Sequence, residues 1–329
     1  MGGRPAAFFR YNMTMEKIRL GISSCLLGER VRYDGGHKLD YFLKNTLGNF
    51  VEWVPVCPEV ESGLPVPREA LRLVGSVDDP RLVTTRSGID HTERIRQWAA
   101  GRLRRIEREE LCGFIFKSRS PSSGLRGVKV YPLSGAPNRS GTGIFARAFM
   151  ERFPLLPIED DGRLHDPLLR ENFVERVFVF RRSRELLKKG GMLRDLVAFH
   201  TEHKLLILSH SPSCYRILGS IVANAKKQDR DKGVHEYLGI LMEGLRLTAT
   251  VKKNTNVLQH IAGYFKKNLS PDEKKELIEI IGHYHKGYIP LIVPITLINH
   301  FVRKFDNRYL ERQHYLHPHP IELMLRNHA

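Results

Sequence analysis

The hydrophobic pattern divides the chain into a first part with strand-like segments and a second part with helical ones. In the first part, short apolar, β-prone runs alternate with segments of helical spacing. The strand-like runs are 18–24, 50–56, 113–117 and 128–131, and the helical segments are 39–47 and 92–110. This order predicts a mostly parallel, Rossmann-like α/β sheet with right-handed crossovers.

From residue 193 onward the strand pattern nearly disappears. Helical spacing is found at 193–209, 214–226, 234–251, 255–268 and 271–285. Because Gly190-Gly191 interrupts the pattern after a segment that becomes helical near Glu171, we place a boundary there. The predicted organisation is a loose extension at 1–14, an α/β domain with a trailing linker helix at 15–190, and an all-α bundle at 191–329.

Composition narrows the class of protein. No segment approaches the roughly 18–20 apolar residues of a membrane span, and 1–14 lacks the apolar centre of a secretory signal, so a cytoplasmic protein is expected. Cysteines at 25, 57, 112 and 214 form no CxxC pair and are expected to be reduced. The net charge of +17 favours polyanions. The positive excess is spread over both halves of the chain, since residues 1–190 hold 33 Lys and Arg against 23 Asp and Glu. This distribution argues against a single basic tail that binds nucleic acid. Nothing in the pattern specifies an oligomeric state.

Two predicted strands each deliver a cysteine to a loop. Cys25 follows the first strand, and Cys57 follows the second. The third strand leads into the loop 118–124, which is rich in serine. Ligands of open α/β sheets bind beyond the carboxyl ends of the strands. The three loops are therefore expected to line one crevice.

Three segments together resemble the signature loops of the TudS thiouracil desulfidases, a bacterial family, in that family's order. They are GISSCLLGERVRYDGGHK (21–38), PVCPEVESGLPVPRE (55–69) and FKSRSPSSGLRGVKVY (116–131). From about residue 193 the chain resembles the YbgA-like helical domain that is often fused behind this module. The resemblance implies a non-redox desulfidase that acts on thiolated pyrimidine bases or nucleotides, such as thiouracil and thiouridine monophosphate. It also implies a [4Fe-4S] cluster on three thiolates, whose fourth iron stays open as a Lewis acid.

One loop departs from the family pattern. The family has Ser-Pro-Ser-Cys-Gly, whereas this chain has Ser123 in place of that cysteine. Cys25 and Cys57 then remain as thiolate ligands, and the third ligand is either Ser123, a harder oxygen donor, or Cys112. Cys112 precedes the third strand and Ser123 follows it, and at about 3.3 Å per residue the strand separates its ends by nearly 20 Å. Cys112 reaches the site only if the strand begins later or the chain doubles back.

Three further residues are candidate catalytic groups. Glu59 can act as general acid or base for the incoming water, because a carboxyl group in a water-poor pocket exchanges protons near neutral pH. Ser120 and Ser122 can position the oxygen or sulfur of the substrate. Their ordinary alternatives are a surface carboxylate that caps a loop and serines of a proline turn.

Substrate binding is predicted for the charged and glycine positions of the same loops. Arg32, Lys117 and Arg119 are candidates for a nucleotide phosphate, with solvated surface charges as the alternative. The other predicted binding positions are Asp34, Gly35, Gly36 and Gly124. The glycines permit a positive φ or a close approach of the backbone.

The helical half has two patterns of its own. His200, His203 and His210 lie on one helical face, where they can bind metal or pack within the bundle. The basic pairs 226–227, 252–253, 266–267 and 274–275 alternate with Tyr264, Phe265 and Tyr284. Such a surface can contact RNA, and solvated helix faces explain it equally well.

Two rival hypotheses follow. In the first, the chain is a non-catalytic descendant that binds a nucleotide or RNA, and Ser123 marks the loss of the cluster. In the second, the helical half is a partner-docking module and the α/β half is its scaffold.

Overall fold

A computed structural model describes residues 17–132, 134–225 and 230–328, and it folds as two units that divide between Phe149 and Met150. The predicted extension at 1–14 lies outside these residues. The division comes earlier than the boundary predicted at 190. The helix predicted to trail the α/β domain is α4 (Pro167–Lys188), and its Val179 and Leu186 belong to the hydrophobic core of the second unit.

The first unit contains a parallel sheet. The strands of this sheet in the first unit are β1 (Ile18–Ser23), β2 (Val51–Val56) and β5 (Phe114–Phe116), in the order β2-β1-β5. The strands are largely buried, as is usual for parallel sheets covered on both faces. Ser23 pairs with Val56, so β1 and β2 end at the same edge. The predicted α/β class with a parallel sheet is confirmed.

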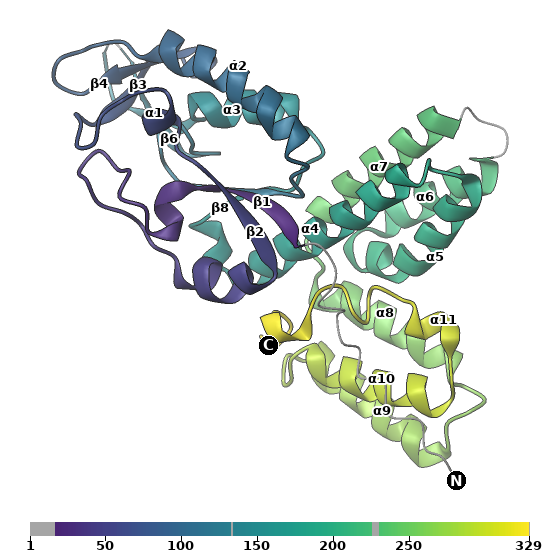
Figure 1. Ribbon diagram of the computed structural model, residues 1–329. Helices are drawn as coiled ribbons and strands as arrows, with labels where there is room; N and C mark the ends of the chain where they lie inside the picture. Colours follow the sequence, from purple (N-terminus) through teal and green to yellow (C-terminus); the bar gives the residue numbers. More distant parts are fainter. Residues whose placement is uncertain (1–16, 133, 226–229, 329) are drawn as a thin grey trace. The chain divides into compact units, whose positions relative to one another are not determined.

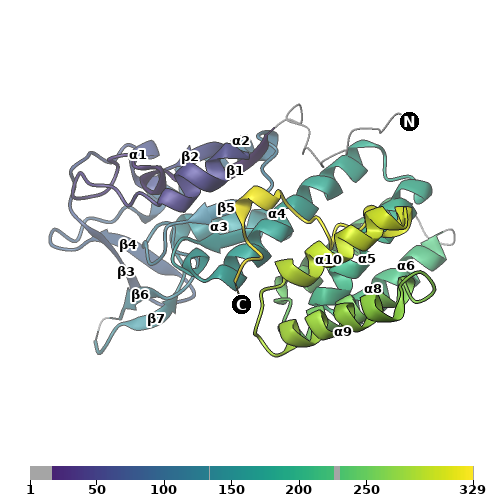
Figure 2. The same ribbon diagram turned by 90° about the horizontal axis from the view of Figure 1, so that it is seen from below.

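A second, mixed sheet completes the first unit. It contains β3 (Leu71–Gly75), β4 (Pro80–Thr84), β6 (Val128–Tyr131) and β7 (Asn138–Gly141) in the order β4-β3-β6-β7. Figure 2 shows these strands side by side. The segment 128–131, expected as a fourth strand of the parallel sheet, pairs here with β3 and β7 because its apolar side chains face a separate small core.

Helices link the strands of the first unit. α2 (Thr92–Arg108) confirms the predicted helix, and it buries Ile95, Ala99, Leu103 and Ile106 at helical spacing. The helix expected at 39–47 is instead a short π-type helix, η2 (Phe42–Thr46), followed by the 3-10 turn η3 (Leu47–Asn49). The remaining elements are the 3-10 turn η1 (Ser24–Leu27), α1 (Pro58–Glu61) and α3 (Ile144–Arg152).

The second unit is helical, as predicted, apart from the short strand β8 (Ile158–Asp160) and the 3-10 turns η4 (Arg163–His165) and η6 (Ile321–Leu323). Its helices after α4 are α5 (Leu193–His210), α6 (Pro212–Asn224), α7 (Arg230–Arg246), α8 (Val251–Tyr264), α9 (Pro271–His285), α10 (Ile292–Lys304) and α11 (Arg308–Glu311). Figure 1 shows α5, α6 and α7 packed together and α8, α9 and α10 packed together. Among the helices of the described residues, none combines the length and the apolar composition of a membrane-spanning segment.

Candidate active site

The three loops at the carboxyl edge of the parallel sheet line one cavity of about 300 Å³ in the first unit. Cys25 lies in η1, directly after β1, and Cys57 lies between β2 and α1. The serine loop after β5 contributes Ser118, Ser120 and Ser123. The fold therefore brings two thiols and the serine loop to the same cavity, although these residues are far apart in sequence.

Both pocket thiols are largely buried, and the Cys57 thiol lies beside a carboxyl group. Cys25 is 7% exposed and Cys57 is 8% exposed. The Cys57 sulfur lies 3.5 Å from a carboxyl oxygen of Glu59, and the Cys57 backbone N–H donates to Glu61 at 2.9 Å. Burial, together with the negative charge of Glu59, raises the pKa of Cys57 to about 12. A positive charge beside the sulfur favours the thiolate, and a bound metal ion would supply such a charge.

Glu59 connects the thiol to the serine loop. Its Oε1 accepts a hydrogen bond from the Ser122 hydroxyl at 2.7 Å, and its Oε2 faces Cys57. The Ser122 oxygen lies 3.1 Å from the hydroxyl of Ser120 and 3.3 Å from that of Ser123. Three predicted residues, Glu59, Ser120 and Ser122, thus form one hydrogen-bonded group with Ser123 at the cavity wall.

The charged lining of the cavity is mainly positive. Arg32, Lys117 and Arg119, predicted to bind phosphate, all line it. Arg68, which sequence reasoning missed, also lines it, lies 4.0 Å from Glu59, and donates to the carbonyl of Val31 at 3.0 Å. Arg68 lies in the segment 55–69 that resembles a family signature loop, and this position could have identified it as a site residue. Glu59 is the one acidic side chain among the described lining residues.

The remaining predicted binding residues shape the loops and do not line the cavity. Asp34 accepts a hydrogen bond from the Gly36 N–H, which lowers the pKa of its carboxyl group. Gly35 has a φ of 75°, so the turn that carries Arg32 uses backbone that favours glycine. A side chain at Gly124 would lie 2.8 Å from the carbonyl oxygen of Ser120.

Cys112 lies at the opposite edge of the sheet. Its backbone N–H donates to the carbonyl of Arg19 at 2.8 Å, near the start of β1, and it does not line the cavity. At about 3.3 Å per residue, the strand from Arg19 to Ser23 spans roughly 13 Å before η1 begins. Cys112 is thus separated from Cys25 and Cys57, and of the two third-ligand candidates only Ser123 shares their cavity.

The backbone of the serine loop packs directly against Gly143. A methyl group there would lie 2.5 Å from the carbonyl of Ser122 and 2.6 Å from the nitrogen of Ser123. We therefore expect Gly143→Ala to lower the free energy of unfolding of the first unit by about 1–3 kcal/mol, through overpacking. The measurement is urea unfolding followed by tryptophan fluorescence, since Trp53 and Trp98 both lie in this unit.

The matched control is Gly101→Ala in α2, where the new methyl group meets no atom within 4 Å. This variant is expected to stabilise the helix by about 0.5–1 kcal/mol. Equal effects of the two substitutions would show that the serine loop is not packed against Gly143.

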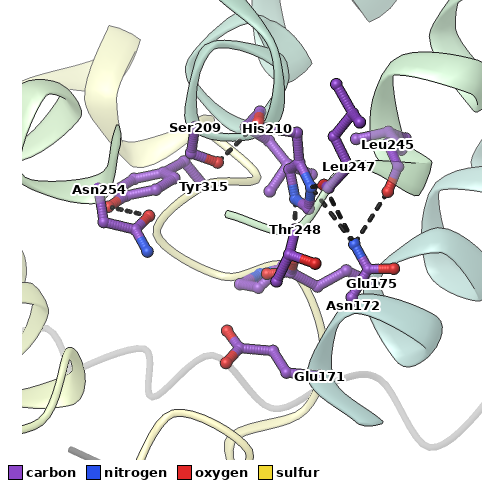
Figure 3. Close-up of polar contacts among 12 residues, drawn as sticks. Glu171, Asn172, Glu175, Ser209, His210, Leu245, Leu247, Thr248, Asn254 and Tyr315 are labelled. Atoms are coloured by element: carbon purple, nitrogen blue, oxygen red, sulfur yellow. Dashed lines mark hydrogen bonds and ion pairs between the residues drawn. The ribbon is translucent and has the colours of Figure 1, made fainter. Parts of the chain in front are cut away.

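A second polar cluster lies inside the helical unit (Figure 3). Ligand atoms of Glu171, Glu175 and His319 lie within 4.8 Å of one another. The Arg326 guanidinium pairs with Glu171 at 2.9 Å and with Glu175 at 2.7 Å, and His210 contacts Glu175 at 3.0 Å. Burial raises the pKa of Glu175, but the hydrogen bond from His210 and the charge of Arg326 outweigh it and lower the pKa to about 2. Burial and the negative charge of Glu175 raise the pKa of Glu171 to about 8, so Arg326 is the cation that faces this pair of acidic groups.

The predicted histidine stripe does not converge on one site. His200 contacts the hydroxyl of Tyr237 at 3.0 Å, and His203 accepts from Arg182 at 3.0 Å. His210 instead contacts Glu175. Each histidine has a separate partner, so the structure does not gather the three around one metal position.

Only some of the residues predicted to contact RNA are exposed. Phe265 is fully buried and Tyr284 is 6% exposed, so neither ring is available for stacking with a base; they belong to the core of the unit. Tyr264 is 39% exposed. Of the basic pairs, 226–227 lies outside the described residues, and the lysines at 252, 266, 267, 274 and 275 are exposed.

Comparison with known proteins agrees with the two units. A family model described as 2-thiouracil desulfurase matches residues 20–161, and one described as a protein of unknown function (DUF1722) matches 204–320. YbgA of Escherichia coli (strain K12) is 32% identical over 143 residues, which cover 43% of this chain and 85% of YbgA. YbbK of Bacillus subtilis (strain 168) is 32% identical over 130 residues, 38% of this chain and 85% of YbbK. Both relatives are described as uncharacterized.

A solved structure of a [4Fe-4S]-dependent thiouracil desulfidase, TudS, is 31% identical and aligns with a TM-score of 0.37, over 46% of this chain and 95% of that one. The fold and the cavity define a two-domain protein with a thiol-lined α/β module followed by a helical module. The chain belongs to the family of YbgA, and its residues 20–161 match the 2-thiouracil desulfurase family model, which together indicate a TudS module fused to a YbgA-like domain.

Proposed function

We propose that the first unit removes sulfur from thiolated pyrimidine bases or nucleotides and replaces it with oxygen from water. The observation that carries this proposal is the placement of two buried thiols, from separate strands, on one cavity beside a carboxyl group and serine hydroxyls. The 2-thiouracil desulfurase family match over residues 20–161 supports the substrate class.

The donor set of the cavity fits an iron–sulfur centre. Thiolates are the ligands that such centres prefer, and Cys25 and Cys57 would hold the [4Fe-4S] cluster that the resemblance implies. When bound, the cluster would supply a Lewis acid for the thiocarbonyl sulfur. The net reaction converts C=S and water into C=O and hydrogen sulfide, so it needs no oxidant or reductant.

Glu59 is the proposed proton acceptor for the attacking water. The Ser122 hydroxyl donates to Oε1 of the carboxyl group, and Oε2 lies 3.5 Å from the sulfur of Cys57. As water adds to the ring carbon, one of its protons passes to Glu59. This proton and the second proton of the water later leave with the sulfur as hydrogen sulfide, and the water oxygen stays on the ring as the carbonyl oxygen. Ser120 and Ser122 keep the carboxyl group in this orientation.

The positive lining favours an anionic substrate, and we therefore propose a nucleotide monophosphate over the free base. Arg32, Arg68, Lys117 and Arg119 together exceed the single negative charge of Glu59. The phosphate would lie toward the exposed Arg119.

Replacing Arg119 by methionine is expected to raise KM for thiouridine monophosphate about tenfold, because one charge-assisted hydrogen bond is lost. KM for thiouracil, which lacks the phosphate, should stay unchanged. Arg139→Met is the control, since this exposed arginine does not line the cavity and removes the same charge. Equal changes for the two substrates would contradict a phosphate contact at Arg119.

Iron content tests the proposed chemistry. Protein purified and reconstituted without oxygen is expected to be brown and to contain about four iron atoms per chain, as one [4Fe-4S] cluster requires. Protein that stays colourless and iron-free under these conditions would refute the cluster.

A second candidate function rests on Ser123. Because this position lacks the family's cysteine, the cavity could serve a protein that binds nucleotides without a cluster. This alternative predicts that iron-free protein binds uridine monophosphate and converts no thiouridine monophosphate after reconstitution.

A further inference from the structure

We infer that the hydroxyl oxygen of Ser123 is the third protein donor to the metal centre, and that Ser122 and Glu59 orient it for this task. The inference rests on the proposed function. It concerns the one ligand position where this chain departs from the Ser-Pro-Ser-Cys-Gly pattern.

The direction of the hydrogen bonds follows from the number of protons. A serine hydroxyl has one proton and two lone pairs. The Ser122 proton is engaged by the carboxyl group of Glu59 at 2.7 Å. Ser122 can therefore only accept from its two serine neighbours, and its lone pairs match Ser120 at 3.1 Å and Ser123 at 3.3 Å. In the 3.3 Å contact between Ser122 and Ser123, the proton therefore comes from Ser123.

This direction makes Ser123 an electron-pair donor toward the cavity. Ser123 is 4% exposed and lines the same cavity as Cys25 and Cys57. With its proton directed at Ser122, its lone pairs are left for the cavity side. If the proton pointed into the cavity, the positive end of the O–H dipole would repel a metal ion. The network thus prepares an oxygen ligand where the family has sulfur.

The backbone fixes this oxygen independently of any ligand. The Ser123 N–H donates to the Ser120 hydroxyl at 3.2 Å. The Phe145 N–H, at the start of α3, donates to the carbonyl of Ser122 at 2.8 Å. Because helix and loop hold the position on both sides, exchange of oxygen for sulfur changes the donor atom and leaves the loop in place. An oxygen donor is harder than a thiolate and binds iron less firmly.

The experiment compares iron retention in the full chain, reconstituted without oxygen, as wild type, Ser123→Ala and Ser123→Cys. The readouts are iron per chain and the half-time of iron loss to a chelator. We expect the alanine variant to lose iron at least about tenfold faster than wild type, the loss of affinity typical when a metal site is weakened. The cysteine variant should lose iron more slowly than wild type.

Ser122→Ala tests the orienting contact. It leaves the Ser123 oxygen in place but frees its proton, so iron loss should lie between wild type and Ser123→Ala. Ser118→Ala is the control, since Ser118 lines the cavity outside the Ser122 group, and iron loss should match wild type. Tryptophan-fluorescence unfolding of each variant verifies that the first unit remains folded.

The outcomes separate the inference from the proposed function. Equal iron retention in wild type and Ser123→Ala, or iron binding by Ser123→Cys alone, would overturn the role of the Ser123 oxygen while leaving the Cys25–Cys57 site intact. Failure of every variant, Ser123→Cys included, to bind iron would overturn both.

Discussion

Replacing Cys57 by alanine is expected to abolish iron binding and to lower kcat/KM for thiouridine monophosphate by at least about 100-fold. The substitution removes one of the two soft donors of the cavity, and neither Ser123 nor Glu59 supplies a second sulfur. Iron per chain and initial rates of desulfuration are the measurements, both made on anaerobically reconstituted protein.

Cys112→Ala is the matched control. It also removes a buried thiol of the first unit, but this thiol lies at the far edge of the sheet beside the carbonyl of Glu110. Iron content and kcat/KM should match wild type even where thermal stability falls. Loss of iron in Cys112→Ala, with retention in Cys57→Ala, would reverse the assignment of the ligands.

Replacing Arg326 by methionine is expected to lower the free energy of unfolding of the helical unit by about 3–5 kcal/mol. The Arg326 side chain is 6% exposed and pairs with Glu171 and Glu175, and it donates to the carbonyl of Tyr315 at 2.6 Å. Its removal leaves two buried carboxyl groups without their main cation. Urea unfolding followed by circular dichroism at the helical band reports this unit.

The control for this variant is Arg312→Met. Arg312 pairs with Glu202, but its side chain is 66% exposed, so the expected loss is below about 1 kcal/mol. A loss below 1 kcal/mol for Arg326→Met as well would show that the buried cluster does not secure the fold.

The helices were predictable wherever their periodicity was strong. α2 and α9 match their predicted segments closely, because a regular apolar stripe faces a core in each and Ser270 and Glu273 form a capping box on α9. α10 escaped prediction because Pro294 interrupts the pattern. In the structure, this proline lies in the first turn, where its missing N–H costs no helical hydrogen bond.

The second sheet was not predictable from local pattern alone. β3 and β4 are short strands between turns, and the core around their apolar residues Leu73 and Leu82 is completed by residues of α2, β6 and α3, farther along the chain. Local preference cannot specify such distant pairing, since the environment of a strand decides much of its stability. For the same reason, the segment 128–131 was correctly predicted as a strand, but its predicted place in the parallel sheet was wrong.

The site was predictable where a strand end fixes a side chain. The rule that parallel strands deliver ligands at their carboxyl ends places Cys25 and Cys57 on one cavity, as observed. The hydrogen-bond directions in the serine loop could not be predicted, because they depend on Glu59, which a different loop supplies. Arg68 was missed for a similar reason: its contacts with Glu59 and Val31 arise only when two loops meet.

Product analysis tests the central claim most directly. Iron-reconstituted protein, given thiouridine monophosphate without oxygen and without any redox partner, should release uridine monophosphate and sulfide in equal amounts. The contrary result would be an iron-loaded, folded protein that leaves both thiouridine monophosphate and thiouracil unchanged. This result would contradict the proposal that the site removes sulfur from thiolated pyrimidines.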